Sequence, residues 1–162
     1  MDEFETLIAQ QIPRLRRYAR VLTGSQPRAD DLVQDALERS WSRRHLWRPG
    51  SDLRAWLFTI MHNIYVNGIR RREPEGPEAF DLPVPPAQEQ AVEVRDLYRA
   101  LARLPSDHRE ILLLVAVEEM RYAEVAEVLN LPLGTVMSRL SRAREQLRTL
   151  MNGEAPPLRR IK

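Results

Sequence analysis

Apolar residues recur every three or four positions along most of the chain, a spacing that indicates amphipathic α-helices rather than strands. In the first half, the pattern predicts one helix that ends before Gly24 and a second that begins after Ser25, a preferred N-cap residue. A third helix follows the turn at 47–52, with Ser51 or Asp52 as its cap. We expect it to run out in the three arginines at 70–72, where cations suit the negative end of the helix dipole.

In the second half, four more helices are predicted over residues 94–104, 106–117, 122–129 and 136–151. The last two are separated only by the break Asn130–Pro132, an arrangement typical of a helix-turn-helix. At about 100° per residue, the apolar side chains of the seventh helix gather on one side. The residues on or beside its free face are Thr135, Met137, Ser138, Arg139, Ser141 and Arg142.

Short hydroxyl side chains beside arginine suit the major groove of DNA, where arginine can contact guanine with two hydrogen bonds. The seventh helix is therefore predicted to bind duplex DNA. The alternative is an amphipathic helix whose arginines are merely solvated. Glu145 on the same face argues for that alternative, because its charge would oppose the phosphates.

The two helical halves are separated by a stretch of different composition. Five prolines lie within residues 74–86, both ends included, and each removes a backbone donor and disfavours helix at the preceding residue. We therefore predict an all-α protein of two small domains joined by an acidic, proline-rich linker. The predicted boundaries are 1–72, 73–88 for the linker, 89–151, and 152–162 for a basic tail.

Charge supports this division. The chain holds 25 basic and 23 acidic residues, a nearly neutral balance that argues against nucleic-acid binding at first sight. Residues 1–72 carry +5, residues 73–94 carry −6 and residues 95–162 carry +3. The neutral total thus hides two basic segments on either side of an acidic one.

No pattern in the sequence indicates an enzyme. The chain has no cysteine, its three histidines are far apart, and its glycines form no phosphate-binding loop. We therefore expect no catalytic residue, no metal and no cofactor. The absence of a long apolar run or a leader-like N-terminus predicts a soluble cytoplasmic protein without membrane insertion.

Two features of the first half suggest partners. The second helix carries an acidic face that includes Asp31, Gln34 and Asp35, which points to a protein partner or to plain solubility. The third helix and the turn before it combine Trp47, Trp56 and Asn63 with the arginines that follow. Aromatic, amide and basic side chains together suit single-stranded nucleic acid, but the tryptophans also fit a core position.

Several stretches resemble the bacterial sigma factors of the extracytoplasmic-function group. Residues 29–37, 53–60, 63 and 70–72 resemble the second conserved region of these proteins. Residues 104–105, 109–110, 122–129 and 134–144 resemble their fourth region. The resemblance covers residues 1–151, and the combination of the two regions makes it specific.

The resemblance implies a transcription initiation factor that binds core RNA polymerase, recognises the minus-thirty-five and minus-ten promoter elements and assists melting. It also implies an anti-sigma factor as a partner. The residues implied to contact core polymerase are Asp31, Gln34 and Asp35. Those implied at the minus-ten element, on duplex and non-template single strand, are Trp47, Ser51, Trp56, Asn63, Arg70, Arg71 and Arg72.

The resemblance also divides the residues of the seventh helix by role. Met137, Ser138, Ser141 and Arg142 are implied to read base edges of the minus-thirty-five element, and Thr135 and Arg139 to hold phosphates. The chain departs from the family at two positions, where Met137 and His62 stand in place of common basic residues. Two alternatives stay open: a stand-alone helix-turn-helix regulator that acts without polymerase, and an adaptor that binds an anti-sigma factor but has lost promoter activity.

Overall fold

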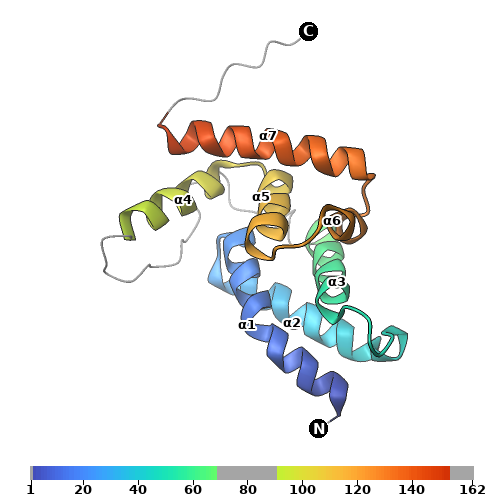
Figure 1. Ribbon diagram of the computed structural model, residues 1–162. Helices are drawn as coiled ribbons and strands as arrows, with labels where there is room; N and C mark the ends of the chain where they lie inside the picture. Colours follow the sequence, from blue (N-terminus) through green and yellow to red (C-terminus); the bar gives the residue numbers. More distant parts are fainter. Residues whose placement is uncertain (1, 69–90, 154–162) are drawn as a thin grey trace.

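The computed structural model describes residues 2–68 and 91–153 (Figure 1). Within these residues the chain forms seven α-helices and no strand, which confirms the predicted all-α class. The first half holds α1 (Glu3–Thr23), α2 (Gln26–Ser42), the short 3-10 helix η1 (Arg44–Leu46) and α3 (Leu53–Asn67). The second half holds α4 (Ala91–Arg103), α5 (Ser106–Leu112), the π-helical segment η4 (Leu113–Val117), α6 (Tyr122–Leu129) and α7 (Leu133–Met151).

Side-chain caps fix where the helices of the first half begin. The Asp2 carboxylate accepts a hydrogen bond from the Glu5 amide at 2.8 Å, and Ser25 and Asp52 cap α2 and α3 in the same way. Gly24 ends α1 in the left-handed conformation, with φ at 66°, which glycine adopts at little cost.

The third helix is shorter than predicted. It ends at Asn67 because Gly68 follows as its C-cap residue, and glycine disfavours helix continuation. Arg70, Arg71 and Arg72 lie outside the described residues, as do the predicted linker at 73–88 and residues 154–162 of the predicted tail.

The predicted fifth helix is also divided. Its regular α-helical part ends at Leu112, and residues Leu113–Val117 form a π-helical turn in which the Glu118 amide donates to the Leu113 carbonyl at 3.0 Å. The chain then turns through Glu119, whose φ is 54°, and enters α6.

The two halves pack against each other. The helices α1, α2 and α3 form one bundle, and α7 lies across α5 and α6 in the other (Figure 1). The main contact between the halves is α6 against α3, with smaller contacts from α1 to α4 and α5. Buried apolar residues of both halves form one continuous cluster.

Candidate nucleic-acid interface

The helix α7 presents one apolar and one polar face, as its sequence predicts. Val136, Leu140 and Ala143 are buried against the rest of the second half, whereas Ser138, Ser141 and Arg142 are exposed. The turn before α7 is made by Asn130 in the left-handed conformation and by Pro132 as the N-cap residue. The helix-turn-helix geometry therefore leaves a row of hydroxyl and guanidinium groups free to contact a ligand.

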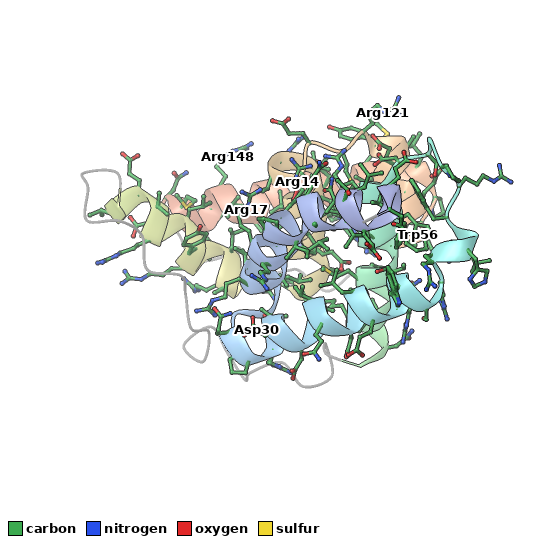
Figure 2. All side chains as sticks on the ribbon, turned by 90° about the horizontal axis from the view of Figure 1, so that it is seen from below. Arg14, Arg17, Asp30, Trp56, Arg121 and Arg148 are labelled. Carbon is green, nitrogen blue, oxygen red and sulfur yellow. The ribbon has the colours of Figure 1, made fainter. Side chains whose placement is uncertain are left out.

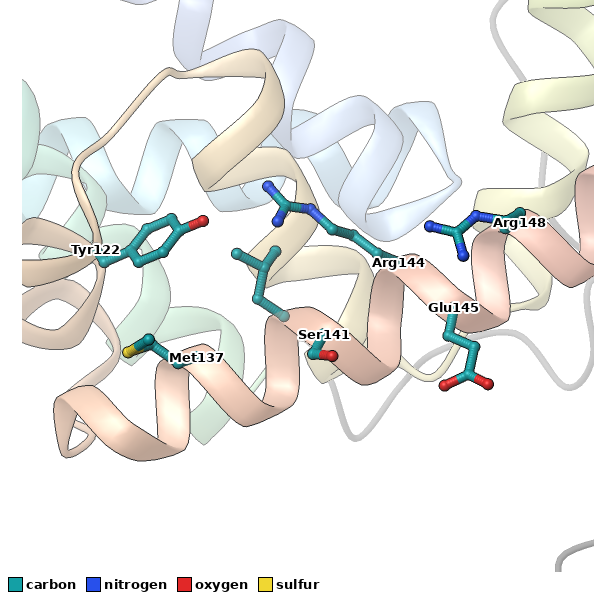
Figure 3. Close-up of a pocket in the computed structure, with 7 residues that line it drawn as sticks. Tyr122, Met137, Ser141, Arg144, Glu145 and Arg148 are labelled. Carbon is teal, nitrogen blue, oxygen red and sulfur yellow. The ribbon is translucent and has the colours of Figure 1, made fainter.

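Beside this row lies a hollow of about 370 Å³ between α6 and α7 (Figure 3). Its floor includes Leu140. The other lining residues are Tyr122, Met137, Ser141, Arg144, Glu145 and Arg148. Figure 3 shows the Tyr122 hydroxyl end pointing toward Arg144, and Glu145 turned away from both arginines. The Glu145 charge therefore opposes an anion in this hollow less than its place in the sequence suggested.

The side chains of Met137 and Arg139 differ in how exposed they are. The Met137 side chain is 52% exposed and lines the hollow. The Arg139 guanidinium is partly covered, and its Nε lies 3.9 Å from Oδ2 of Asp107 on α5. Thr135 is half-buried, and its carbonyl accepts a hydrogen bond from Ser138 Oγ at 3.2 Å.

The tryptophans of the first half gather around Phe4. The ring centroids of Trp47 and Trp56 lie 5.6 and 6.0 Å from that of Phe4. Trp47 is only 7% exposed, so it is mainly a core residue, whereas Trp56 is half-buried. Of the two rings, Trp56 is the better placed to stack on a base.

Polar residues beside this aromatic cluster face solvent. Ser51 and Asn63 are exposed, although Ser51 Oγ donates to the Arg48 carbonyl at 2.6 Å. Asn63 lies on α3, one position beyond His62. The exposed amide of Asn63 and the partly open ring of Trp56 are thus presented by the same rigid helix.

The acidic face of α2 is open. Asp31, Gln34 and Asp35 are all exposed, and the Gln34 amide donates to Glu38 Oε1 at 3.3 Å. The buried side of α2 packs on α1 and α3, and the acidic face is exposed among the described residues. Asp30, labelled in Figure 2, extends the face by one position and accepts a hydrogen bond from Gln26 at 2.8 Å.

Charged groups also meet where the two halves touch. Glu118, whose side chain is fully buried, lies 3.6 Å from the Arg14 Nε of α1. Burial raises the pKa of its carboxyl, and the nearby guanidinium groups of Arg14, Arg17 and Arg54 lower it by less. Burial likewise raises the pKa of Tyr18 well above its usual value, and the charges of Glu110 and Glu118 raise it further.

Three further polar contacts cross between the halves. Arg54 donates from a guanidinium nitrogen to the Glu118 carbonyl at 2.5 Å. Arg109 donates from Nε to the Leu22 carbonyl at 3.0 Å. His62 Nδ1 lies 2.9 Å from Glu110 Oε1, which gives the family-atypical histidine a partner in the second half.

Sequence patterns did not indicate all of these residues. Tyr122, Arg148 and the contacts across the halves were not predicted, because they depend on which helices pack together. Among the described residues no three His, Asp or Glu side chains are grouped so as to hold a metal ion. No helix in the described part of the chain is long and apolar enough to cross a membrane.

Comparison with protein families matches both halves. Residues 8–62 match the model for the sigma2 domain of PhyR, and residues 94–147 match the model for sigma-70 region 4. Each match falls within one of the two helical halves described above.

Individual relatives match along nearly the whole chain. The ECF RNA polymerase sigma factor EcfG of Rhodopseudomonas palustris is 37% identical over 155 residues, which cover 93% of this chain and 86% of the relative. The ECF RNA polymerase sigma factor RpoE of Cereibacter sphaeroides is 30% identical over 156 residues, covering 92% and 86%. The sigma factor RpoE of Bartonella quintana, solved in complex with the anti-sigma factor NepR, superposes with a TM-score of 0.79 at 31% identity, covering 96% of this chain and all of that one. By fold, by both matched regions and by its relatives, the chain belongs to the extracytoplasmic-function family of RNA polymerase sigma factors.

Proposed function

We propose that the protein binds core RNA polymerase in the cytoplasm and directs it to promoters by reading two separate DNA elements. The observation that carries this proposal is the arrangement of α7, where an apolar seam buries one side and exposes Ser138, Ser141 and Arg142 on the other. A helix in this arrangement can enter a major groove while the rest of its domain stays folded. The membership of the chain in a sigma factor family supports the same function.

In this proposal, the residues on and beside the exposed face of α7 have different roles. Met137, Ser138, Ser141 and Arg142 read base edges at the minus-thirty-five element. Thr135 and Arg139 hold phosphates, which requires the Arg139 guanidinium to exchange Asp107 for DNA. Tyr122, Arg144 and Arg148 line the hollow between α6 and α7, where they add a hydroxyl and two positive charges for contact with the DNA backbone.

The first half acts on the minus-ten element. The turn at Trp47–Asp52 and the exposed Asn63 hold a base that leaves the duplex, and Trp56 offers a ring edge next to it. Extruding a base costs a few kcal/mol, which stacking and hydrogen bonds to the base edge offset. Arg70, Arg71 and Arg72 lie outside the described residues, and their proposed contact with upstream duplex rests on the family resemblance.

Two protein partners complete the proposal. The acidic face at Asp31, Gln34 and Asp35 docks on core polymerase, because a charged face that is exposed among the described residues suits a basic partner. An anti-sigma factor controls the protein. This follows from the likeness to a sigma factor solved with such a partner.

The test is transcription from a random promoter library by purified chain and core polymerase. Start sites that require the added chain, upstream of which two common elements appear, are the expected result. A chain that binds a defined duplex without polymerase would be a stand-alone regulator. A chain that binds an anti-sigma factor but selects no start site would be an adaptor.

The melting role has a separate test. Asn63→Ala should reduce open-complex formation on duplex promoters and be rescued on templates that are already open at the minus-ten element. If pre-opened templates rescue nothing, the proposed base contact of Asn63 is wrong.

A further inference from the structure

The first turns of α7 carry large apolar side chains that are exposed. Leu133 and Met137 are 48% and 52% exposed, and their spacing of four residues places them next to each other on the surface of the helix. Ser141 continues the same row at the next turn and is also exposed. Exposed apolar side chains that occur together, rather than singly, are typical of a surface that binds a ligand. The row at Leu133, Met137 and Ser141 is therefore a candidate contact surface.

This row lies at the end of α7 that meets the bases when a helix-turn-helix binds DNA. In that motif the N-terminal residues of the second helix reach the base edges in the major groove. Leu133 and Met137 are the first and fifth residues of α7. Gly134 between them has no side chain, and a β-carbon at that position would meet no atom of the described residues within 4 Å. A duplex can therefore approach this end of the helix closely.

The neighbours of the row favour nucleic acid over an apolar protein surface as its ligand. Met137 lines the hollow between α6 and α7 together with Tyr122, Arg144 and Arg148. Figure 3 shows Met137 and Tyr122 toward the N-terminal end of α7 and the two arginines farther along the same helix. Arginine and tyrosine side chains commonly contact the phosphates of DNA. The apolar row is thus bordered by groups that can hold a phosphate backbone.

Only one base in DNA offers an apolar group in the major groove. Guanine, cytosine and adenine present hydrogen-bond donors and acceptors there, whereas thymine presents one acceptor and the C5 methyl group. A methionine side chain donates no hydrogen bond and its sulfur is a weak acceptor, so covering the polar edges would remove their water without replacing it. Against a methyl group the same side chain makes van der Waals contact, and its three rotatable bonds let it adjust its position.

We propose that Met137, with Leu133 beside it, contacts the C5 methyl group of thymine, so that the chain selects a T·A pair within the minus-thirty-five element. This inference deepens the proposed function and rests on it, because the contact forms only when α7 enters the major groove. Arg142 lies five residues farther along α7 and reads a different base pair. Met137 is then a specificity-determining residue that acts without a hydrogen bond.

The test replaces thymine by deoxyuridine, which forms the same base pair but lacks the C5 methyl group. A promoter is first selected from a random library by core polymerase with the chain, and each T·A pair of its minus-thirty-five element is then replaced in turn. At one position the replacement should weaken binding about fourfold, which corresponds to about 0.8 kcal/mol for one buried carbon group. The affinity is measured by titrating each duplex with the polymerase complex.

Variants of the chain assign this effect to a side chain. Met137→Ala should bind the thymine and deoxyuridine duplexes equally, whereas Met137→Leu should keep the preference because leucine is also apolar. Met151→Ala is the matched control, since Met151 is 42% exposed on the last turn of the same helix. This control should respond to deoxyuridine as the unmodified chain does. Circular dichroism checks that each variant keeps its helices.

Two results would overturn the thymine contact and leave the proposed function standing. One is a selected element in which no deoxyuridine replacement changes the affinity. The other is a Met137→Ala variant that keeps the full response to deoxyuridine, and weaker binding of that variant to core polymerase without DNA would then assign the row to a protein contact. Selection of no common element would instead overturn the proposed function, and the thymine contact with it.

Discussion

Arg142 is an exposed guanidinium on the face of α7 opposite its buried seam, with Ser138 and Ser141 beside it. An arginine that contacts guanine with two hydrogen bonds contributes about 1–3 kcal/mol of discrimination against other bases. Arg142→Ala should therefore relax the preference at one position of the minus-thirty-five element and leave the other positions unchanged. Selection from a randomised promoter library by the polymerase complex measures this directly.

The exposed Arg95 of α4 offers a control with the same change of charge, and Arg95→Ala should leave every preference unchanged. An equal loss of affinity for all sequences in Arg142→Ala would assign the side chain to a phosphate instead.

Glu118 makes the free energy of unfolding depend on pH. Since burial raises its carboxyl pKa, the folded chain binds more protons than the unfolded chain at pH values between the ordinary value of 4.5 and the raised one. The free energy of unfolding therefore falls as pH rises through that window, and the cost persists at higher pH. Glu118→Gln should remove this slope and raise Tm at pH 7, by about 2–4 °C for each kcal/mol recovered.

Thermal melting of this variant and of the unmodified chain over a series of pH values checks the direction of the change in Tm. Glu119 is exposed and adjacent, so Glu119→Gln makes the same chemical change without the burial and should leave the profile as it is. A lower Tm in Glu118→Gln at neutral pH would show that the Arg14 ion pair outweighs the cost of burial.

At the scale of elements, the turn between α6 and α7 depends on one backbone conformation. Asn130 has φ at 54° and ψ at 52°, and its amide donates to the Glu127 carbonyl at 3.2 Å. A β-branched residue is strained in this left-handed region, so Asn130→Val should lower the free energy of unfolding by about 1–2 kcal/mol. Asn130→Gly is the control, because glycine adopts the conformation freely. Urea denaturation followed by circular dichroism should place the glycine variant near the unmodified chain, and equal losses in both would point to the side chain instead.

The helices themselves could be predicted because each buries one face, and the apolar residues of that face recur every three or four positions in the sequence. The same pattern cannot distinguish an α-helical from a π-helical turn within the uniformly apolar run at Leu113–Val117. It could not show that Trp47 joins Phe4 in the core, since both a core and a base-stacking site use aromatic residues. The contacts across the halves join residues as far apart as Leu22 and Arg109, and no local pattern pairs such positions.

At the scale of the whole molecule, the packing of the two halves separates the two proposed kinds of binding. The face of α2 that carries Asp31, Gln34 and Asp35 is exposed, whereas α3 is partly covered by α6. A partner that docks on α2 meets a surface that takes no part in the contact between the halves. Polymerase affinity should therefore depend on this face and hardly at all on that contact.

Substitution of Gln34→Ala together with Asp35→Arg should strongly weaken association with core polymerase and leave the fold intact. Losing one partner of a charge pair at an interface costs about 2–5 kcal/mol, which lowers affinity roughly thirtyfold or more. Both side chains are exposed, so circular dichroism and Tm should match the unmodified chain. Glu127→Arg makes the same change of net charge on the exposed side of α6 and should leave the affinity unchanged. Affinity is measured by titrating labelled chain with core polymerase. Equal affinity of the double variant and the control would contradict the α2 assignment if both bound as tightly as the unmodified chain. A loss of affinity in both variants would attribute the attraction to overall charge.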